Sequence, residues 1–229
     1  MRVAVVSDLH GNRPALEAVL ADCPPVDGWC CAGDVVGYGP HPGFCVEAMR
    51  EREVPTVLGN HDRAVVTDTD FSFNSRAHDG VVYARRELTD DQRRWLNGLP
   101  TARAAFDGRI AVVHGHPEDP DRYVYPALFS GDDVAAARRE VPGAEECAVL
   151  VCGHTHVQGH ERFDEGVVLN PGSVGQPRDG DSRAAYAILD LETLAVEERR
   201  VEYDVDAMVD AVRAAGLPEG SGTRLRKGR

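Results

Sequence analysis

Short polar motifs close five apolar runs in this chain, and this arrangement constrains the fold more than any other feature of the sequence. The runs span residues 3–6, 29–32, 54–58, 110–113 and 149–152. The motifs that follow them are Asp8-Leu9-His10, Gly33-Asp34, Gly59-Asn60-His61-Asp62, His114-Gly115-His116 and Gly153-His154-Thr155-His156. Short runs rich in Val and Ile predict buried strands. Because ligands bind at the carboxyl ends of strands in open α/β sheets, the motifs predict one shared site at a sheet edge.

The remaining sequence predicts helices and further strands around this framework. Asn12 caps a first helix, and Thr89 and Gln92 form a capping box that opens another. Helices are also expected at residues 44–52, 75–88, 131–140 and 205–215. Asp107-Gly108 predicts a hairpin that joins strands 102–106 and 109–114. Strands at 166–169, 184–190 and 195–203 suggest an antiparallel second sheet, and residues 117–130 read as a loop.

The length of 229 residues suits one substantial domain, which we place at residues 1–215. The tail at 216–229 is rich in Gly, Ser and Arg, and this composition predicts disorder.

Charge and hydropathy exclude two classes of partner. The net charge of −13 argues against a nucleic-acid surface. No apolar stretch has membrane-spanning length, and Arg2 is followed by only four small apolar residues, unlike a signal peptide. We therefore expect a cytoplasmic protein. Of the 25 basic residues only Lys227 is a lysine, which fits either adaptation to molar salt or a high-GC genome.

Six cysteines are present, and none forms a Cys-x-x-Cys pair. They are Cys23, Cys30, Cys31, Cys45, Cys147 and Cys152. Several lie in apolar runs, where a free thiol behaves as a small hydrophobe. We expect all six to be reduced and structural, including Cys152 beside His154.

The motifs together offer carboxylates, imidazoles and an asparagine amide. Such a mixed oxygen and nitrogen set suits manganese, iron, zinc, nickel or cobalt better than calcium. Two ions about 3.5–4 Å apart can clamp the attacking and leaving oxygens of an in-line displacement at phosphorus, with a bridging hydroxide as nucleophile. A carboxylate must bridge the ions, and Asp34 at the end of its strand is the natural candidate.

The motifs, their order and their placement resemble the calcineurin-like metallophosphoesterase superfamily, from Arg2 to about Asp190. The stretches at 7–12, 33–40 and 170–178 are similar to its small prokaryotic phosphodiesterase branch. The resemblance implies an α/β (α+β) fold, a four-layer sandwich of two facing mixed β-sheets flanked by helices. It also implies two divalent ions as cofactors, with manganese favoured.

The resemblance further implies a role for each matching position. Asp8, His10 and His156 would bind the first metal, and Asn60, His114 and His154 the second, with Asp34 bridging. His61 would donate a proton to the leaving oxygen, and Asp62 would orient His61.

Three residues near the motifs are candidates for contact with the substrate. Arg178, in the loop after the 166–169 strand, is the one strong candidate cation near the motifs. Tyr38, with the 117–130 loop, would shape the pocket. His116 either touches substrate phosphate or lies in a solvated loop, and the loop is favoured.

These observations predict a dinuclear-metal phosphoesterase that acts on small phosphorylated molecules. A single added cation and a negative chain disfavour the more highly charged monoesters, so a phosphodiesterase is expected. The alternatives are a protein or nucleotide phosphomonoesterase, or a dinucleoside polyphosphate hydrolase. A non-catalytic interaction module is a third reading, against which the intact Asp8, His10, Asn60, His61 and His154 count. Oligomeric state stays open.

Overall fold

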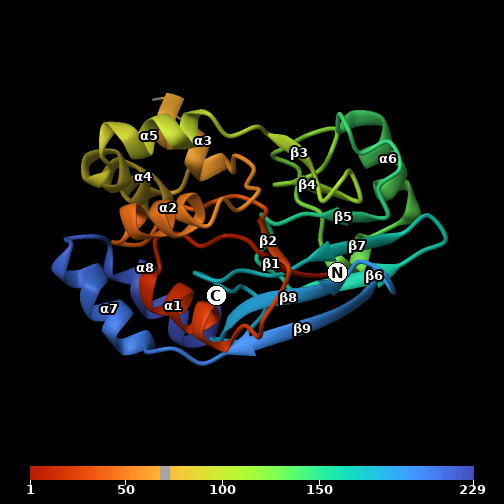
Figure 1. Ribbon diagram of the computed structural model, residues 1–229. Coiled ribbons are helices and arrows are strands. Elements are labelled where there is room, and N and C mark those ends of the chain that lie inside the picture. Colours follow the sequence, from red (N-terminus) through yellow and green to blue (C-terminus); the bar gives the residue numbers. More distant parts are fainter. Residues whose placement is uncertain (68–72) are drawn as a thin grey trace.

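The computed structural model describes residues 1–67 and 73–229 and contains two mixed sheets that face each other (Figure 1). The first sheet has the strand order β2-β1-β8-β9. Its strands are β1 (Arg2–Val6), β2 (Gly28–Cys31), β8 (Ala184–Asp190) and β9 (Ala195–Val201). β1 is parallel to β2, whereas β8 runs antiparallel to both β1 and β9.

The second sheet has the strand order β3-β4-β5-β7-β6. Its strands are β3 (Ala102–Ala105), β4 (Ile110–Val113), β5 (Val149–Val151), β6 (Gly159–Arg162) and β7 (Val167–Asn170). The three central strands are parallel, and β3 and β6 pair antiparallel at the two edges. The predicted hairpin at Asp107-Gly108 is confirmed as the β3–β4 connection.

Helices follow the strands β1, β2, β4 and β9. They are α1 (Arg13–Asp22), α2 (Pro42–Glu51), α3 (Asn60–Thr67), α4 (Ser75–Glu87), α5 (Asp90–Asn97), α6 (Gly131–Glu140), α7 (Val205–Ala214) and α8 (Glu219–Thr223), with the 3-10 helices η1 (Pro126–Leu128) and η2 (Arg224–Lys227). Asn12 caps α1, and Thr89 and Gln92 form the predicted capping box of α5. No helix in residues 1–67 and 73–229 combines the length and the hydrophobicity of a membrane span.

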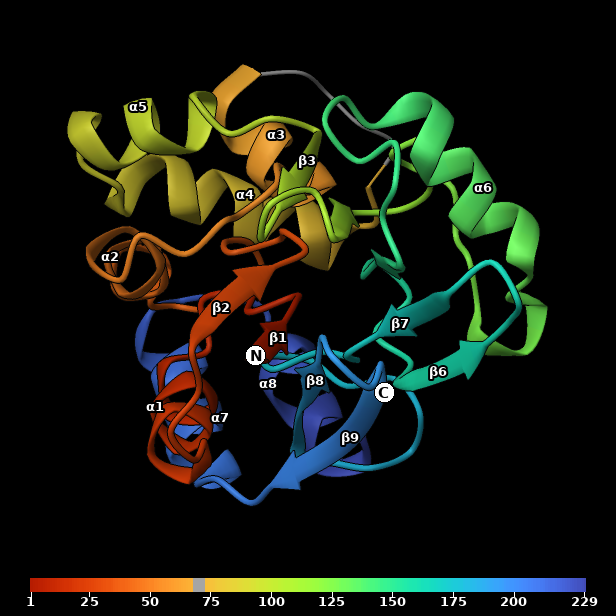
Figure 2. The same ribbon diagram turned by 45° about the vertical axis from the view of Figure 1, so that its right-hand side comes forward.

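Apolar side chains fill the space between the sheets and beneath the helices. Val5 of β1, Val112 of β4 and Val151 of β5 belong to the cluster between the two sheets. Leu16 and Met49 belong to the cluster under α1 and α2, and α6 covers the outer face of the second sheet. Figure 2 shows α6 on one side of the sheets and α1, α2 and α7 on the other. The predicted four-layer sandwich is confirmed.

The structure differs from the prediction at one strand and in the grouping of one sheet. Residues 54–58 contain only an isolated bridge between Cys31 and Thr56, because Pro55 has no N–H to donate to a ladder. The predicted antiparallel sheet of 166–169, 184–190 and 195–203 is confirmed for β8 and β9, which pair antiparallel, but it is wrong for β7, which pairs parallel with β5 in the other sheet. Apolar runs identify strands but do not specify their partners.

The C-terminal segment is ordered, in contrast to the disorder that its composition predicts. Residues 219–227 form α8 and η2. Leu225 is buried and packs with Met208, Val212 and Leu217. Two leucines of this polar tail, Leu217 and Leu225, therefore anchor the segment to α7.

Candidate metal centre and active site

The backbone of the motif loops is left-handed at five positions that carry chemistry. Asp8, His10, Asp34, His154 and His156 have φ values of 53°, 48°, 52°, 64° and 60°. Such values are uncommon outside glycine and are often found at functional sites. Hydrogen bonds between the loops hold this geometry: Asp8 N–H donates to Gly33 O at 2.9 Å, and His10 N–H donates to Asp34 O at 3.0 Å.

Two glycines allow the loops to meet. Gly33 has φ 92°, and a Cβ there would lie 2.8 Å from Gly59 N. A Cβ on Gly59 would overlap the Asp34 carboxylate. The glycines of Gly33-Asp34 and Gly59-Asn60 are therefore required by the close approach of one motif to the other.

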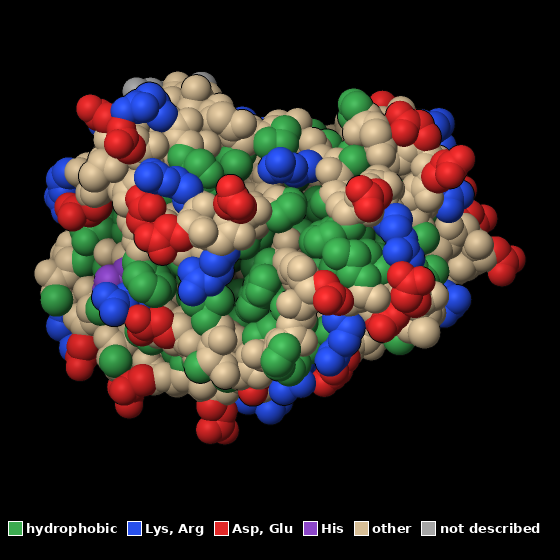
Figure 3. Space-filling view, viewed as in Figure 1, with side chains coloured by type: hydrophobic (Ala, Val, Ile, Leu, Met, Phe, Trp, Pro, Cys, Tyr) green, Lys and Arg blue, Asp and Glu red, His purple; other side chains and the backbone are tan. Residues whose placement is uncertain are grey.

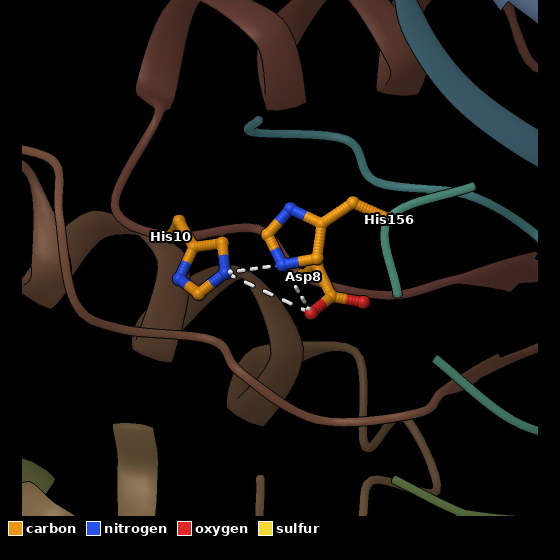
Figure 4. Close-up of side chains that lie close together, drawn as sticks. All are labelled: Asp8, His10 and His156. Carbon is orange, nitrogen blue, oxygen red and sulfur yellow. Dashed lines mark hydrogen bonds and ion pairs between the residues drawn. The ribbon is translucent and has the colours of Figure 1, made fainter. Parts of the chain in front are cut away.

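The first ligand group consists of Asp8, His10 and His156 (Figure 4). His156 Nε2 lies 3.1 Å from Asp8 Oδ1 and 3.2 Å from His10 Nε2. His10 Nε2 lies 3.7 Å from the same carboxylate oxygen. All three side chains are buried, although they come from loops far apart in the sequence.

The hydrogen bonds of these histidines fix which ring nitrogen carries the proton. His10 Nδ1 donates to Val36 O at 3.0 Å, and His156 Nδ1 donates to Gln176 O at 2.6 Å. A carbonyl only accepts, so in the neutral rings both Nε2 atoms carry bare lone pairs. These lone pairs converge with Asp8 Oδ1, a buried oxygen that has no hydrogen-bond donor within the described residues. Three acceptors facing one another fit a bound cation.

The second ligand group consists of Asp34, His114 and His154, with Asn60 beside them. His114 Nε2 lies 3.1 Å from Asn60 Oδ1, 3.1 Å from His154 Nδ1 and 3.4 Å from Asp34 Oδ2. Here too the other nitrogens donate to carbonyls: His114 Nδ1 to Ala32 and His154 Nε2 to Asp121.

Asp34 lies between the two groups. Its Oδ2 is 3.4 Å from His114 Nε2 and 3.7 Å from His10 Nε2, and its Oδ1 accepts from the His61 N–H. The seven residues predicted as ligands are thus brought together, with the predicted bridging carboxylate at the centre.

The electrostatics favour ionised carboxylates and mostly neutral imidazoles. Burial by itself raises the pKa of Asp8 and Asp34, but His156 and His114 respectively outweigh it and hold each pKa below its usual range. Burial lowers the pKa of His10 and brings that of His154 to about 4. His114 is the exception: burial disfavours its charge, yet Asp34 raises its pKa to about 10.

His61 lies in the first turn of α3 with its ring between two aromatic side chains. The ring centre is 4.6 Å from that of Tyr38 and 4.7 Å from that of Phe73, with which it stacks. Its Nδ1 is buried without a hydrogen-bond partner within the described residues, and burial lowers the pKa of His61 to about 4. One ring nitrogen also lies within ligand range of His10 and Asp34. Its position beside the metal groups therefore suits a proton donor or a ligand.

The carboxylate of Asp62, which we predicted to orient His61, contacts two backbone amides. Its Oδ1 accepts from Val36 N–H at 3.0 Å, and its Oδ2 accepts from Gly59 N–H at 3.1 Å. Burial and the charge of Asp34 raise the pKa of Asp62 to about 7. Asp62 ties the loop after β2 to the loop before α3, and so acts on Asn60 and His61 through the backbone.

A cavity of about 260 Å³ opens above the two groups. The predicted substrate residues Tyr38 and Arg178 both line it, together with Tyr123. Two arginines that sequence reasoning missed, Arg76 and Arg224, also line it. Neither lies in a motif, and the composition around Arg224 predicts a disordered tail.

His116 is neither in a solvated loop nor at the cavity. It is buried, its Nε2 donates to Asp133 Oδ1 at 3.2 Å, and its Nδ1 accepts from Glu118 N–H at 3.2 Å. Asp133 belongs to the capping box of α6, so His116 fastens the 117–130 loop to that helix. The cysteines are all unpaired, as predicted, and none joins a candidate metal group in the described residues.

Comparison with known proteins assigns this geometry to a family. Residues 1–194 match the calcineurin-like phosphoesterase superfamily domain. The chain belongs to this superfamily. A metallophosphoesterase structure from Sphaerobacter thermophilus is 36% identical, with 100% of both chains covered and a TM-score of 0.85. Among curated proteins, the uncharacterized protein MJ0912 of Methanocaldococcus jannaschii is 32% identical over 242 residues, covering 99% of this chain and 98% of the relative.

A second curated relative carries a named activity. Phosphodiesterase YfcE of Escherichia coli is 28% identical over 203 residues, covering 86% of this chain and 91% of the relative. Membership in the calcineurin-like phosphoesterase superfamily makes phosphoester hydrolase the enzyme class of the chain.

Proposed function

We propose that this chain is a dinuclear-metal phosphodiesterase. The observation that carries the proposal is the pair of buried ligand groups that share Asp34, in which imidazole nitrogens lie 3.1–3.2 Å apart beneath a cavity. Asp8, His10 and His156 would hold one ion, and Asn60, His114 and His154 the other. The activity named for YfcE supports the choice of diesters.

In the proposed reaction the bound metals and the side chains of the chain have different roles. When bound, two divalent ions supply Lewis-acid charge at the phosphoryl oxygens and lower the pKa of water. We assign manganese first, with nickel, iron, zinc and cobalt as alternatives. His61 stands at the cavity wall and transfers a proton to the leaving oxygen. Asp62 holds the two loops that place Asp34 and His61.

The distribution of cations favours a diester over a monoester at the reacting phosphorus. A monoester brings an additional negative charge, which a strict monoesterase binds with cations next to the metals. Arg178 instead donates to the hydroxyl of Tyr38, at 3.4 Å, while the ring of Tyr38 contacts His61. The guanidinium of Arg178 is thus already engaged by Tyr38 and by Gln176, although, besides burial, its charge also lowers the pKa of His156.

The substrate we propose is a small phosphorylated molecule, since the cavity is of small-molecule size. The unpaired thiols are typical of a reducing compartment, and we propose the cytoplasm.

Substrate turnover with defined metals tests the proposal. Metal-free protein is reloaded with manganese, nickel, zinc, iron or cobalt and assayed with bis(p-nitrophenyl) phosphate and with p-nitrophenyl phosphate. We expect cleavage of the diester with manganese or nickel. Robust monoester hydrolysis without diester cleavage under every metal would replace the proposal by a phosphomonoesterase.

A further inference from the structure

Three arginines from separate parts of the chain line one cavity. Arg76 belongs to the first turn of α4, Arg178 follows β7, and Arg224 begins η2. The ligand groups contribute Asp34, His154 and others to the same cavity. A chain with a net charge of −13 thus concentrates positive charge at its candidate active site.

Each arginine is held without an Asp or Glu side chain as ion-pair partner among the described residues. Arg178 donates to Gln176 Oε1 at 2.9 Å and to Tyr38 OH at 3.4 Å. Arg224 Nε donates to the main-chain carboxylate oxygen of Arg229, the last residue of the sequence, so Arg224 has a main-chain and not a side-chain anion as its partner. Elsewhere arginines are commonly neutralised: Arg63 pairs with Asp121, and Arg200 pairs with Asp179.

The C-terminal segment positions two of these side chains. Gly220 of α8 leaves room for Arg76, because a Cβ there would lie 3.3 Å from both Cδ and Nη1 of Arg76. Leu225 is buried beside α7 and fixes η2, which carries Arg224. Gly180 N–H donates to Gly228 O at 3.0 Å and joins this segment to the loop of Arg178.

The three charges act on one another. Burial lowers the pKa of Arg224, and the neighbouring charges of Arg178 and Arg76 lower it further. Like charges brought together in a half-buried wall destabilise the free protein, and an anion bound among them removes that cost. Guanidinium groups present forked donors that match phosphate oxygens.

We propose that Arg76, Arg178 and Arg224 bind a second, non-scissile phosphate of the substrate, so that the substrate is a phosphodiester carrying a further phosphate group. This inference rests on the proposed function. The Tyr38 ring contacts the rings of His10 and His61, and its centre lies 5.8 Å from Arg178 Cζ. The second phosphate would therefore lie beside Tyr38, in the cavity that the ligand groups also line.

A matched pair of substrates tests the inference with the metal-loaded protein. One is thymidine 5′-(p-nitrophenyl phosphate), and the other is the same diester with an added 3′-phosphate. We expect the 3′-phosphate to lower KM by about tenfold, as for charge-assisted hydrogen bonds. Arg224→Ala should bring the ratio of the two KM values to about one, whereas Arg224→Lys should restore part of the difference.

Arg226→Ala is the matched control, because Arg226 lies in the same η2 but pairs with Asp206 on the surface. It should change neither KM, and the melting temperatures of the variants report whether they fold. Equal KM values for the two diesters in the wild type would overturn the inference. So would an equal loss for both diesters in Arg224→Ala, since the arginine would then act on the scissile phosphate.

A binding measurement tests this inference independently of the proposed function. Titration calorimetry of thymidine 3′,5′-bisphosphate and of thymidine 5′-monophosphate needs no turnover. Tighter binding of the bisphosphate, lost in Arg224→Ala, supports the arginine subsite even if neither diester is cleaved. Equal binding of the two nucleotides contradicts it even if the diesters are good substrates.

Discussion

Adjacent residues of one motif have different roles in the active site. Asn60, His61 and Asp62 follow one another at the start of α3, yet one faces His114, one lies between aromatic rings and one binds backbone amides. The motif alone predicts that all three belong to the site. It does not predict that the Asp62 carboxylate contacts backbone amides, because this depends on where the fold places Val36 and Gly59.

His61→Ala is expected to retain both metals and to lower turnover by about 10²–10⁴-fold, as for a lost general acid. Metal analysis and kinetics of the purified variant measure the two effects. His160→Ala, which removes an exposed histidine paired with Glu198, is the control. Loss of a metal from His61→Ala would show that His61 is a ligand.

Asp62→Asn is expected to destabilise the protein by about 1–3 kcal/mol, because an amide group replaces an oxygen that accepts a backbone N–H. Metal content should fall together with the free energy of unfolding in urea. A variant with normal stability and metal content but no turnover would instead restore the role of orienting His61.

At the scale of elements, the sequence predicts the framework better than its connections. The range 131–140 predicted for α6 matches the structure, and the strands that end at the motifs are found except at 54–58. β6 was missed because Gly159–Arg162 is largely exposed and has no apolar pattern. The order of the C-terminal segment depends on tertiary packing of Leu225, which composition does not reveal.

Leu225→Ala tests whether that packing holds the segment. The side chain is 1% exposed, and loss of a buried leucine typically costs about 2–5 kcal/mol. We expect a lower urea midpoint, with Arg226→Ala unchanged. An unaltered midpoint would mean that η2 contributes nothing to the stability of the fold.

At the scale of the whole molecule, the excess of acidic over basic residues bears on stability. Figure 3 shows Asp and Glu side chains interspersed with Lys and Arg over one face. The excess negative charge of the chain, −13 in total, therefore does not form a single acidic patch on this face. The excess of carboxylates nevertheless repels itself.

Salt should therefore stabilise the protein. At 1 M salt the Debye length is roughly 3 Å, so repulsion between surface charges is screened. We predict a melting temperature that rises from low salt to molar potassium chloride, measured with the metals held constant. A flat response would attribute the scarcity of lysine to genome composition and not to salt adaptation.

Metal stoichiometry tests the central claim most directly. Wild-type protein, Asp34→Asn and the surface control Asp210→Asn are purified, reloaded with manganese and analysed for bound metal per chain by mass spectrometry. The shared position of Asp34 predicts two ions per chain in the wild type and in Asp210→Asn, and fewer in Asp34→Asn together with abolished turnover. Wild-type protein that binds no metal on reloading would contradict the account.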